Sequence, residues 1–516
     1  MARTLFRRTA SVLVICFGIV LAGCNVQQNL GKETWYQVES DNFRIVTNGD
    51  PAAVQTLAAD LERYRAVALQ LLGAEPSKQK LTIYAAADRD SYGGLVGEEL
   101  AEMTNGLFDT TAQGSYALVN LDGRSGERQL QAREFLFHEY THYLSYNGNT
   151  THYPYWYSEG FAEFMSTMTF DQNGRYKLGA IPEERAMTLV YTSPMPLEQL
   201  LRATVYNTPD NEKGGVYASG WMLAHWLLMK SGKVEEFKEY VNAYNNGADP
   251  VEALEKSLGM SLAQIDKEYE AMFENGTFDL AGGTVPADFR EAKPVVTQLS
   301  PRHAVAEIGR FLVMSGYNLE GLLHLFQYAS AAGVDSPELT AVQADAETRI
   351  GNFDRAQQLL ATVPAGRRDE IWYQTADAWL GLNRQVGLPG EARDRDALKK
   401  VRDEFVFLVN NDADTASHWF GLAMAMEMLD YPRDKYVEML EQAYLRAPRE
   451  AHIAQWLAQE LYEQKDAEFF ARVAKPLMLE LDNEEEFEQM KTMLAELQGD
   501  PKPVEKTQTK LARKEG

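Results

Sequence analysis

The chain has 516 residues, of which 45% are hydrophobic and 24% are charged, and its formal net charge is −25 at pH 7. This length predicts two or three compact units, and the ordinary composition excludes both a wholly disordered chain and a protein with several membrane spans. The acidic balance argues against nucleic acid or anionic lipid as a main partner.

The N-terminus is typical of a bacterial lipoprotein signal peptide. Three arginines precede an apolar run over 11–21 that is too short to span a bilayer as a mature helix. The run leads into Leu-Ala-Gly-Cys, which resembles the lipobox whose cysteine, here Cys24, is lipidated and becomes the new N-terminus. An ordinary signal peptide with an incidental cysteine is the alternative. We expect removal of 1–23, a linker over 24–34, and a lipid anchor as the only attachment to a membrane.

The residue after the lipobox and the cysteine count refine this expectation. Asn25 is not the aspartate that is associated with retention in the inner membrane, so the resemblance implies the outer membrane of a bacterial envelope, facing the periplasm. The only other cysteine, Cys16, lies in the segment expected to be removed. The mature chain therefore has no thiol for a metal site, and any metal must use nitrogen and oxygen ligands.

The segment 35–285 alternates strand-like and helical patterns, which predicts an α+β domain. Strand patterns at 43–47 and 81–85 flank a helical pattern at 51–72, and a further strand candidate covers 114–121. Helical patterns then cover 130–146, 156–168 and 214–230 and continue to about residue 275. Glycine and proline breakers place a domain boundary between residues 280 and 298.

The segment 299–498 is composed almost entirely of helical patterns in pairs. One pair, 339–349 and 354–362, resembles a tetratricopeptide repeat, and a second unit over 418–448 has an incomplete signature. The α+β domain is therefore expected to be followed by an all-α helical-repeat (TPR-like) domain, with a disordered tail over 499–516. The repeats either bind a protein partner or only buttress the domain before them.

A short run of residues carries the chemistry. His138-Glu139-Tyr140-Thr141-His142 matches H-E-x-x-H, and helical spacing puts both imidazoles on one face, one turn apart, with Glu139 beside the metal they bind. A hydrolytic zinc site takes three protein ligands, so a third donor is expected downstream. Glu159 is well placed, at the start of the next predicted helix.

This constellation resembles the gluzincin zinc peptidases, which include thermolysin and the alanyl aminopeptidases. H-E-x-x-H is followed by Glu159-Gly160-Phe161-Ala162, which matches the gluzincin E-G-x-A pattern. The resemblance implies an α+β zincin-like metallopeptidase domain over 35–285, with Zn²⁺ held by His138, His142 and Glu159. The region similar to the family covers roughly 35–280 and is closest to the peptidase-MA-like domains. It contains no G-A-M-E-N-like segment of the kind with which aminopeptidases hold a free amine.

The same resemblance assigns two supporting residues. Glu163, four residues after the third ligand, matches the carboxylate that orients a zinc-bound histidine, although a solvated helix face is the alternative. Tyr217, in Tyr-Ala-Ser-Gly, matches a tyrosine that donates to the oxyanion, although a core aromatic is the alternative and His152 is a weaker candidate for that role. In zincins an extended substrate pairs with an edge strand, for which 114–121 is the candidate.

Two functions follow for the whole chain. The first is a zinc metallopeptidase that hydrolyses envelope proteins or peptides, with Glu139 as general base to a zinc-activated water. The alternative is a non-catalytic lipoprotein scaffold that binds partner proteins through its TPR-like repeats. Intact metal ligands and an intact Glu139 favour the first.

Overall fold

The computed structural model describes most of the chain, namely residues 30–73, 80–122, 128–146, 151–204, 207–480 and 484–499. Cys24 and nearly all of the predicted tail lie outside these residues. The chain divides into two compact units. The first consists of Met1–Tyr143 and Thr284–Arg446, and the second consists of Leu144–Gly283 and Ala447–Gly516. The domain limits predicted from the sequence, 35–285 and 299–498, rest on glycine and proline breakers and not on contacts, and they stay a prediction.

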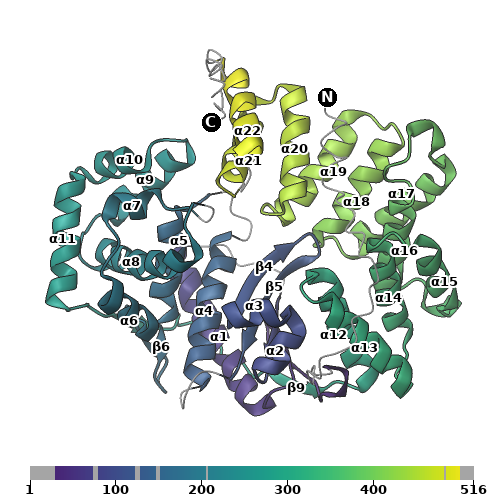
Figure 1. The fold of residues 1–516 in the computed structure, drawn as a ribbon, viewed down its shortest axis with the longest axis horizontal. Coiled ribbons are helices and arrows are strands. Elements are labelled where there is room, and N and C mark those ends of the chain that lie inside the picture. Colours follow the sequence, from purple (N-terminus) through teal and green to yellow (C-terminus); the bar gives the residue numbers. More distant parts are fainter. Residues whose placement is uncertain are drawn as a thin grey trace, which may run out of the picture. The chain divides into compact units, whose positions relative to one another are not determined.

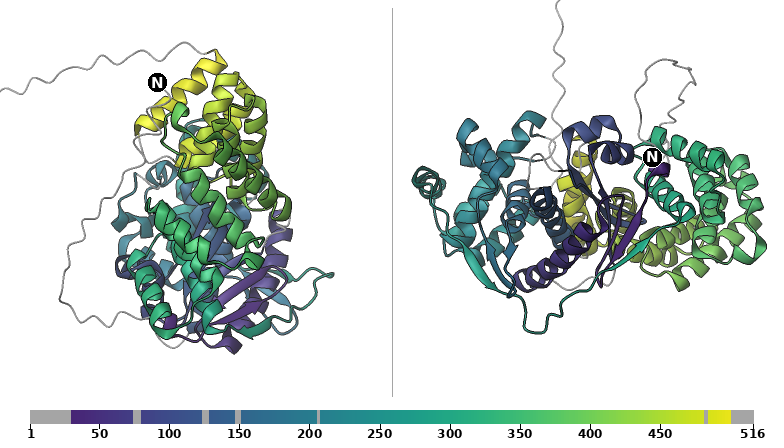
Figure 2. Two further views of the ribbon diagram at one scale, coloured as in Figure 1. Left: turned by 90° about the vertical axis from the view of Figure 1, so that its right-hand side faces the viewer. Right: turned by 90° about the horizontal axis from the view of Figure 1, so that it is seen from below.

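The first unit contains a mixed six-stranded sheet (Figure 1). Its strands in spatial order are β4 (Gly106–Thr111), β5 (Gly114–Asn120), β3 (Leu81–Ala86), β2 (Phe43–Thr47), β1 (Tyr36–Glu39) and β9 (Val295–Gln298). Strands β2, β3 and β5 are parallel, whereas β4, β1 and β9 pair antiparallel to their neighbours. Strand β9 thus joins a sheet that otherwise comes from the first quarter of the chain, and it lies beside β1 (Figure 2).

Helices cover both faces of this sheet. On one face, Val46, Tyr84 and Leu118 pack in a common core with helices α2 (Arg89–Val96) and α12 (Pro301–Ser315). The strand residues that alternate with these, such as Phe43, point to the opposite face. There they pack against helices α1 (Pro51–Leu72) and α4 (Arg128–Tyr146). Because both faces are covered, the central strands are nearly continuous apolar runs.

Helix α1 shows why some predicted bounds match the structure. Asp50 accepts a hydrogen bond from the Ala52 amide, Pro51 occupies the first turn, and Gly73 ends the helix with a φ of 59°. An N-cap acid, a proline at the start and a left-handed glycine at the end are all local signals. The predicted helix at 51–72 and the predicted strand at 43–47 are confirmed.

The prediction that 114–121 is an edge strand is wrong. These residues form β5, which lies between β3 and β4, and the sheet edge is β4. The sequence of β4, Gly-Leu-Phe-Asp-Thr-Thr, lacks the apolar alternation that marks a strand. A two-residue turn joins it to β5, so the edge follows from hairpin pairing rather than from a pattern within either strand.

A buried ion pair fastens α12 to the sheet. The Arg44 guanidinium on β2 donates to Glu307 on α12, with Nη1–Oε1 and Nη2–Oε2 distances both 2.8 Å. The Tyr84 hydroxyl also donates to Glu307, at 3.0 Å. Burial alone would raise the pKa of Glu307, but the hydrogen bond and charge of Arg44 lower it below its usual value.

Replacing Arg44 by methionine should lower the free energy of unfolding by about 3 kcal/mol at neutral pH, since it leaves a buried carboxylate without its main partner. Chemical denaturation measures this loss. The deficit should shrink progressively as the pH falls from 4.5, the usual pKa of a glutamate, through the lowered pKa of Glu307 in the folded protein, because below that pKa the carboxyl is protonated in both the folded and the unfolded state. The matched control is Lys80→Met, which breaks an exposed pair with Glu39 and should cost less than about 1 kcal/mol. Equal costs would contradict the role assigned to the buried pair.

The second unit is mainly helical. Two helices, α5 (Tyr155–Ser166) and α8 (Asp210–Met229), pack closely along each other, and α6 (Glu183–Thr192) packs on α8 (Figure 1). A small sheet has the order β6 (Thr169–Phe170), β7 (Arg175–Leu178) and β8 (Ala281–Thr284). The remaining helices are α7 (Leu197–Arg202), α9 (Val234–Asn245), α10 (Pro250–Leu258), α11 (Leu262–Asn275), α20 (Ala451–Gln464), α21 (Ala467–Glu480) and α22 (Glu484–Gln498).

The first unit is completed by further helices. They are α3 (Glu98–Met103), α13 (Leu319–Ala332), α14 (Pro337–Arg349), α15 (Phe353–Thr362), α16 (Ile371–Asn383), α17 (Arg395–Asn411), α18 (Ala416–Met428) and α19 (Arg433–Arg446). Consecutive helices from α14 onward contact each other in this unit, and the predicted pair at 339–362 is confirmed as helices.

The mixed α/β architecture is confirmed, whereas tetratricopeptide character stays a prediction. Among the described residues, no helix has the length and apolarity needed to cross a bilayer.

Candidate metal centre

Contacts with α1 fix the orientation of helix α4 about its own axis. The Tyr64 hydroxyl lies 2.6 Å from Thr141 Oγ1, which in turn donates to the Phe137 carbonyl at 2.7 Å. The Tyr64 ring stacks on Phe137 with ring centroids 4.0 Å apart. Since His138 and His142 directly follow these two α4 residues, the contacts with α1 also fix the direction in which both imidazoles point.

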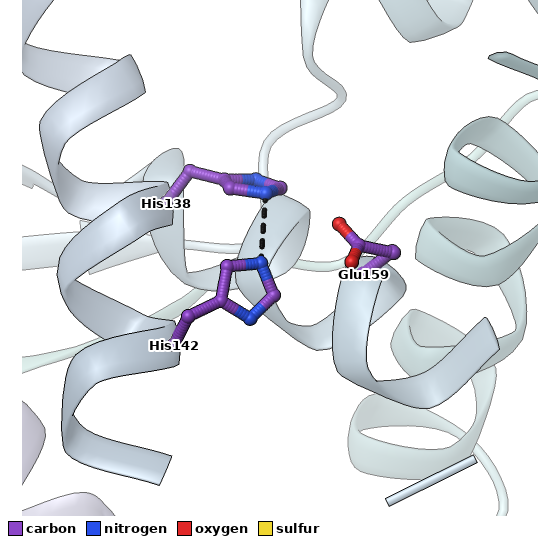
Figure 3. A group of neighbouring side chains, drawn as sticks. All are labelled: His138, His142 and Glu159. Carbon is purple, nitrogen blue, oxygen red and sulfur yellow. Dashed lines mark hydrogen bonds between the residues drawn. The ribbon is translucent and has the colours of Figure 1, made fainter. Parts of the chain in front are cut away.

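The two imidazoles converge. Their Nε2 atoms lie 3.1 Å apart and their rings are steeply inclined at 73° (Figure 3). Both residues are buried, with 8% of each exposed. Two nitrogens on one tetrahedral zinc ion, each at about 2.0–2.1 Å, would lie about 3.3 Å apart, so this pair fits zinc.

Glu159 supplies the third donor. It lies in the first turns of α5, and its carboxylate, together with ring nitrogens of His138 and His142, forms a group whose ligand atoms all lie within 4.8 Å of one another (Figure 3). Two imidazoles and one carboxylate are the donor set of hydrolytic zinc sites that keep a position for water. The structure thus brings together all three residues that the sequence analysis selected as ligands.

A contact between two glycines sets the spacing of α5 and α8. A Cβ added to Gly160 would lie 2.1 Å from the backbone of Gly220, and one added to Gly220 would lie 2.4 Å from the Trp156 carbonyl oxygen. Such an approach requires that both residues lack a side chain. Glu159 directly precedes one glycine, and Tyr217 lies one turn before the other. The E-G-x-A motif and the Tyr-Ala-Ser-Gly motif therefore lie on the two helices that cross here.

Glu163 and Tyr217 share a partner that the sequence analysis missed. Glu163 is only 5% exposed, which excludes the solvated helix face considered above. Arg185 on α6 donates from Nη2 to Glu163 Oε1 at 2.8 Å, and its Cζ lies 5.0 Å from the centroid of the Tyr217 ring. Tyr217 is half-buried, and Tyr155 meets its ring edge-on with centroids 6.4 Å apart.

A second missed residue lies near Glu139. Glu139 is half-buried on α4, and the buried Tyr92 on α2 pairs through its hydroxyl with Thr104 Oγ1 at 3.0 Å. Burial raises the pKa of Tyr92, its hydrogen bond with Thr104 lowers it, and the negative charge of Glu139 raises it. Tyr92 therefore stays a neutral phenol beside this carboxylate. Its surrounding sequence, Asp-Ser-Tyr-Gly, carries no signal for that position.

His152 is buried in the second unit and is fixed through its backbone. Its amide donates to Asn245 Oδ1 at 2.8 Å, and Asn245 Nδ2 donates back to the His152 carbonyl at 2.6 Å. This reciprocal clamp attaches the aromatic segment before α5 to the end of α9. The role of oxyanion donor for His152 stays a prediction.

Comparison with known proteins identifies one related family. A family model described as collagenase, of peptidase family M9, matches residues 110–274, less than half of the chain. No curated protein matches the chain, and neither does any solved structure. The matched range contains His138, His142 and Glu159, and the matched family consists of metallopeptidases that use zinc.

Proposed function

We propose that this chain, which is a zinc metallopeptidase and hence a hydrolase, cleaves peptide bonds of envelope proteins or peptides with Glu139 as its general base. The observation that carries this proposal is the group formed by His138, His142 and Glu159, whose ligand atoms all lie within 4.8 Å of one another. A non-catalytic scaffold would need neither this donor set nor the Glu139 carboxylate that directly follows His138 in the sequence.

The chain's own residues then have separate tasks. His138, His142 and Glu159 would hold a zinc ion, which would supply Lewis-acid chemistry for the activation of water and the polarisation of the scissile carbonyl. Glu139 takes a proton from the attacking water and delivers it to the leaving amine. Tyr217 donates a hydrogen bond to the carbonyl oxygen as negative charge develops there. Glu163 orients a ligand histidine, as the resemblance to gluzincins implies.

Strand β4 is the proposed place for an extended substrate. It is an edge of the six-stranded sheet, and most of its residues are only partly buried. An edge strand presents backbone donors and acceptors with which a peptide can pair. The proposal replaces β5, which the sequence analysis had favoured.

The lipid anchor at Cys24 and an outer-membrane location facing the periplasm remain part of the proposal. They rest on the lipobox-like run at 21–24. A protein partner on the helices after α13 is also proposed, on the resemblance of 339–362 to a tetratricopeptide repeat.

Zinc content tests the proposal directly. Protein lacking residues 1–24 should hold about one zinc per chain after dialysis against a weak chelator, because three protein ligands converge. Glu159→Gln should weaken zinc binding by at least about 100-fold, since it replaces an anionic ligand by a neutral amide. Glu235→Gln, an exposed glutamate paired with Lys238 on α9, is the control and should bind zinc like the wild type. A wild type that holds no zinc would overturn the proposal.

A further inference from the structure

Arg185 joins the two helices that meet at the glycine crossing. It lies on α6, and its guanidinium contacts the Glu163 carboxylate of α5 and the ring of Tyr217 on α8. All of these residues belong to the second unit. Neither contact is local in sequence, because Glu163 and Tyr217 lie 22 residues before and 32 residues after Arg185.

The surroundings make this guanidinium a fixed charge. The Arg185 side chain is 22% exposed and that of Glu163 is 6% exposed. Although burial lowers the pKa of Arg185, the charge and hydrogen bond of Glu163 raise it above its usual value. Arg185 also lies 4.0 Å from Glu184, an exposed neighbour that adds little. A planar cation over an aromatic face gains both stacking and electrostatic attraction.

We propose that Arg185 is a positioning residue, which holds the Tyr217 phenol and the Glu163 carboxylate in one geometry for catalysis. The proposal rests on the function proposed above, in which the phenol donates to the developing oxyanion. The glycine contact fixes the distance between α5 and α8, but it does not fix the direction of the Tyr217 side chain. The guanidinium contributes to this direction together with the edge-on Tyr155 ring, because its Cζ lies over the Tyr217 ring while Nη2 is held by Glu163.

Two substitutions separate the tasks of Arg185. Arg185→Met removes both the positive charge and the planar guanidinium group. It also leaves the Glu163 carboxylate buried without this partner, so the variant carries a risk of misfolding. Arg185→Lys keeps a cation for Glu163 but loses the planar fork that covers the ring. The lysine variant therefore tests the positioning of Tyr217 in a protein that still folds.

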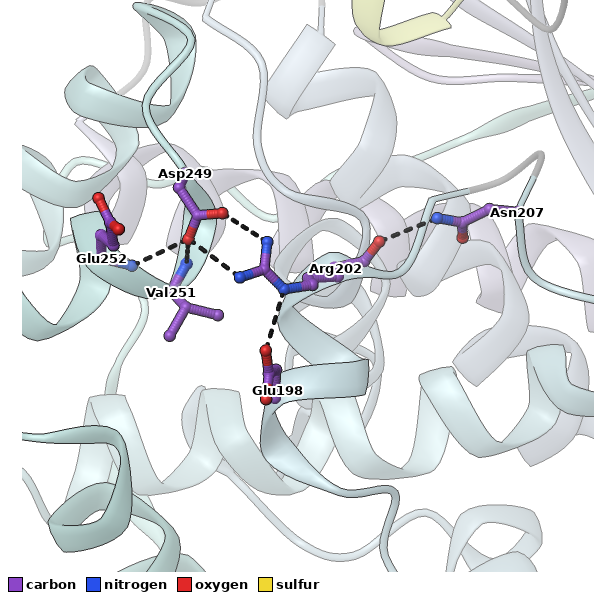
Figure 4. A network of polar contacts seen from close by, with 6 residues as sticks. All are labelled: Glu198, Arg202, Asn207, Asp249, Val251 and Glu252. Carbon is purple, nitrogen blue, oxygen red and sulfur yellow. Dashed lines mark hydrogen bonds and ion pairs between the residues drawn. The ribbon is translucent and has the colours of Figure 1, made fainter. Parts of the chain in front are cut away.

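Arg202 provides the matched control. It lies on α7 of the same unit and pairs with Asp249 and Glu198, as Figure 4 shows, but 45% of its side chain is exposed. Asp249 also caps α10 by accepting from two backbone amides, so this network has a structural task of its own. Arg202→Lys should leave kcat and KM within about twofold of the wild type.

The kinetic test uses the full zinc enzyme and a peptide substrate. Arg185→Lys should lower kcat about tenfold with KM changed less than about twofold, because the loss falls on a transition-state interaction. In a Tyr217→Phe background the same substitution should change kcat less than about twofold, because there is no phenol left to position. Equal losses in both backgrounds, or a rise in KM alone, would overturn the proposal.

A second readout needs no substrate. Unfolding in urea of the wild type, Arg185→Lys, Tyr217→Leu and the double variant measures the coupling between the guanidinium and the aromatic ring, because leucine removes the ring that phenylalanine would keep. We expect the two effects on the unfolding equilibrium constant to deviate from additivity by about threefold or more. Additive effects would overturn the positioning role even if the enzyme is active. Coupled effects in a protein that hydrolyses no peptide would instead contradict the proposed function and leave the packing of Arg185 on Tyr217 established.

Discussion

Replacing Glu139 by glutamine should lower kcat for peptide hydrolysis by about 10²–10⁴-fold while the zinc content stays at about one per chain. The amide has almost the same shape as the carboxylate but accepts no proton, so the loss is that of the general base alone. Because Glu139 is not among the three ligand residues, the metal group should stay intact. Elemental analysis and initial rates on the same preparation measure both quantities.

Glu134 supplies the control for this substitution. It lies on α4 as well, one turn before His138, and belongs to the same described helix. Glu134→Gln should keep kcat within about threefold of the wild type. An active Glu139→Gln variant would assign the base to another group, and loss of zinc from it would mean that Glu139 is a ligand.

Replacing Gly160 by alanine should damage both stability and the metal site. The new Cβ would lie 2.1 Å from the Gly220 backbone, closer than any side chain tolerates, so α5 and α8 must separate. Overpacking of this kind costs about 1–3 kcal/mol or more in the free energy of unfolding. Glu159 moves with α5, so we also expect zinc binding to weaken at least about tenfold. Denaturation and a competition assay with a chelator measure the two losses.

Gly214 tests whether this loss comes from the close contact. It lies on α8 like Gly220, but a Cβ added there would meet no atom within 4 Å. Gly214→Ala should be neutral or stabilise the protein by up to about 1 kcal/mol, because alanine is the better helix former. If Gly160→Ala were equally harmless, the crossing of α5 and α8 would not be what sets the site's spacing.

Local signals in the sequence account for the parts of the fold that were predicted well. Helix α1 has a cap at each end, and the turn between α14 and α15 carries Gly351 with a φ of 82°. The H-E-x-x-H spacing is itself a property of one helix, so His138 and His142 needed no tertiary information. Glu159 followed from its place at the start of the next predicted helix and from the gluzincin E-G-x-A pattern.

The remaining features depend on contacts between distant segments. Nothing within β9 indicates that it pairs with β1, and nothing within α12 indicates that it packs on this sheet, since Arg44 and Glu307 meet across 263 residues. Arg185 and Tyr92 are single residues without a motif, and only packing brings them beside Tyr217 and Glu139. The edge position of β4 likewise follows from the order in which the strands pair, and the residues of β4 carry no pattern that indicates it.

The contact of Gly160 with Gly220 limits how the site can vary. A contact between side chains can be restored after one substitution by a second, complementary substitution, because rotamers and volumes adjust. Here backbone meets backbone, and neither position can accept a larger residue whatever occupies the other. Directed evolution for new substrates should therefore leave both glycines unchanged while it alters the side chains around them, and sequence libraries that randomise all of α5 and α8 should return this pair intact.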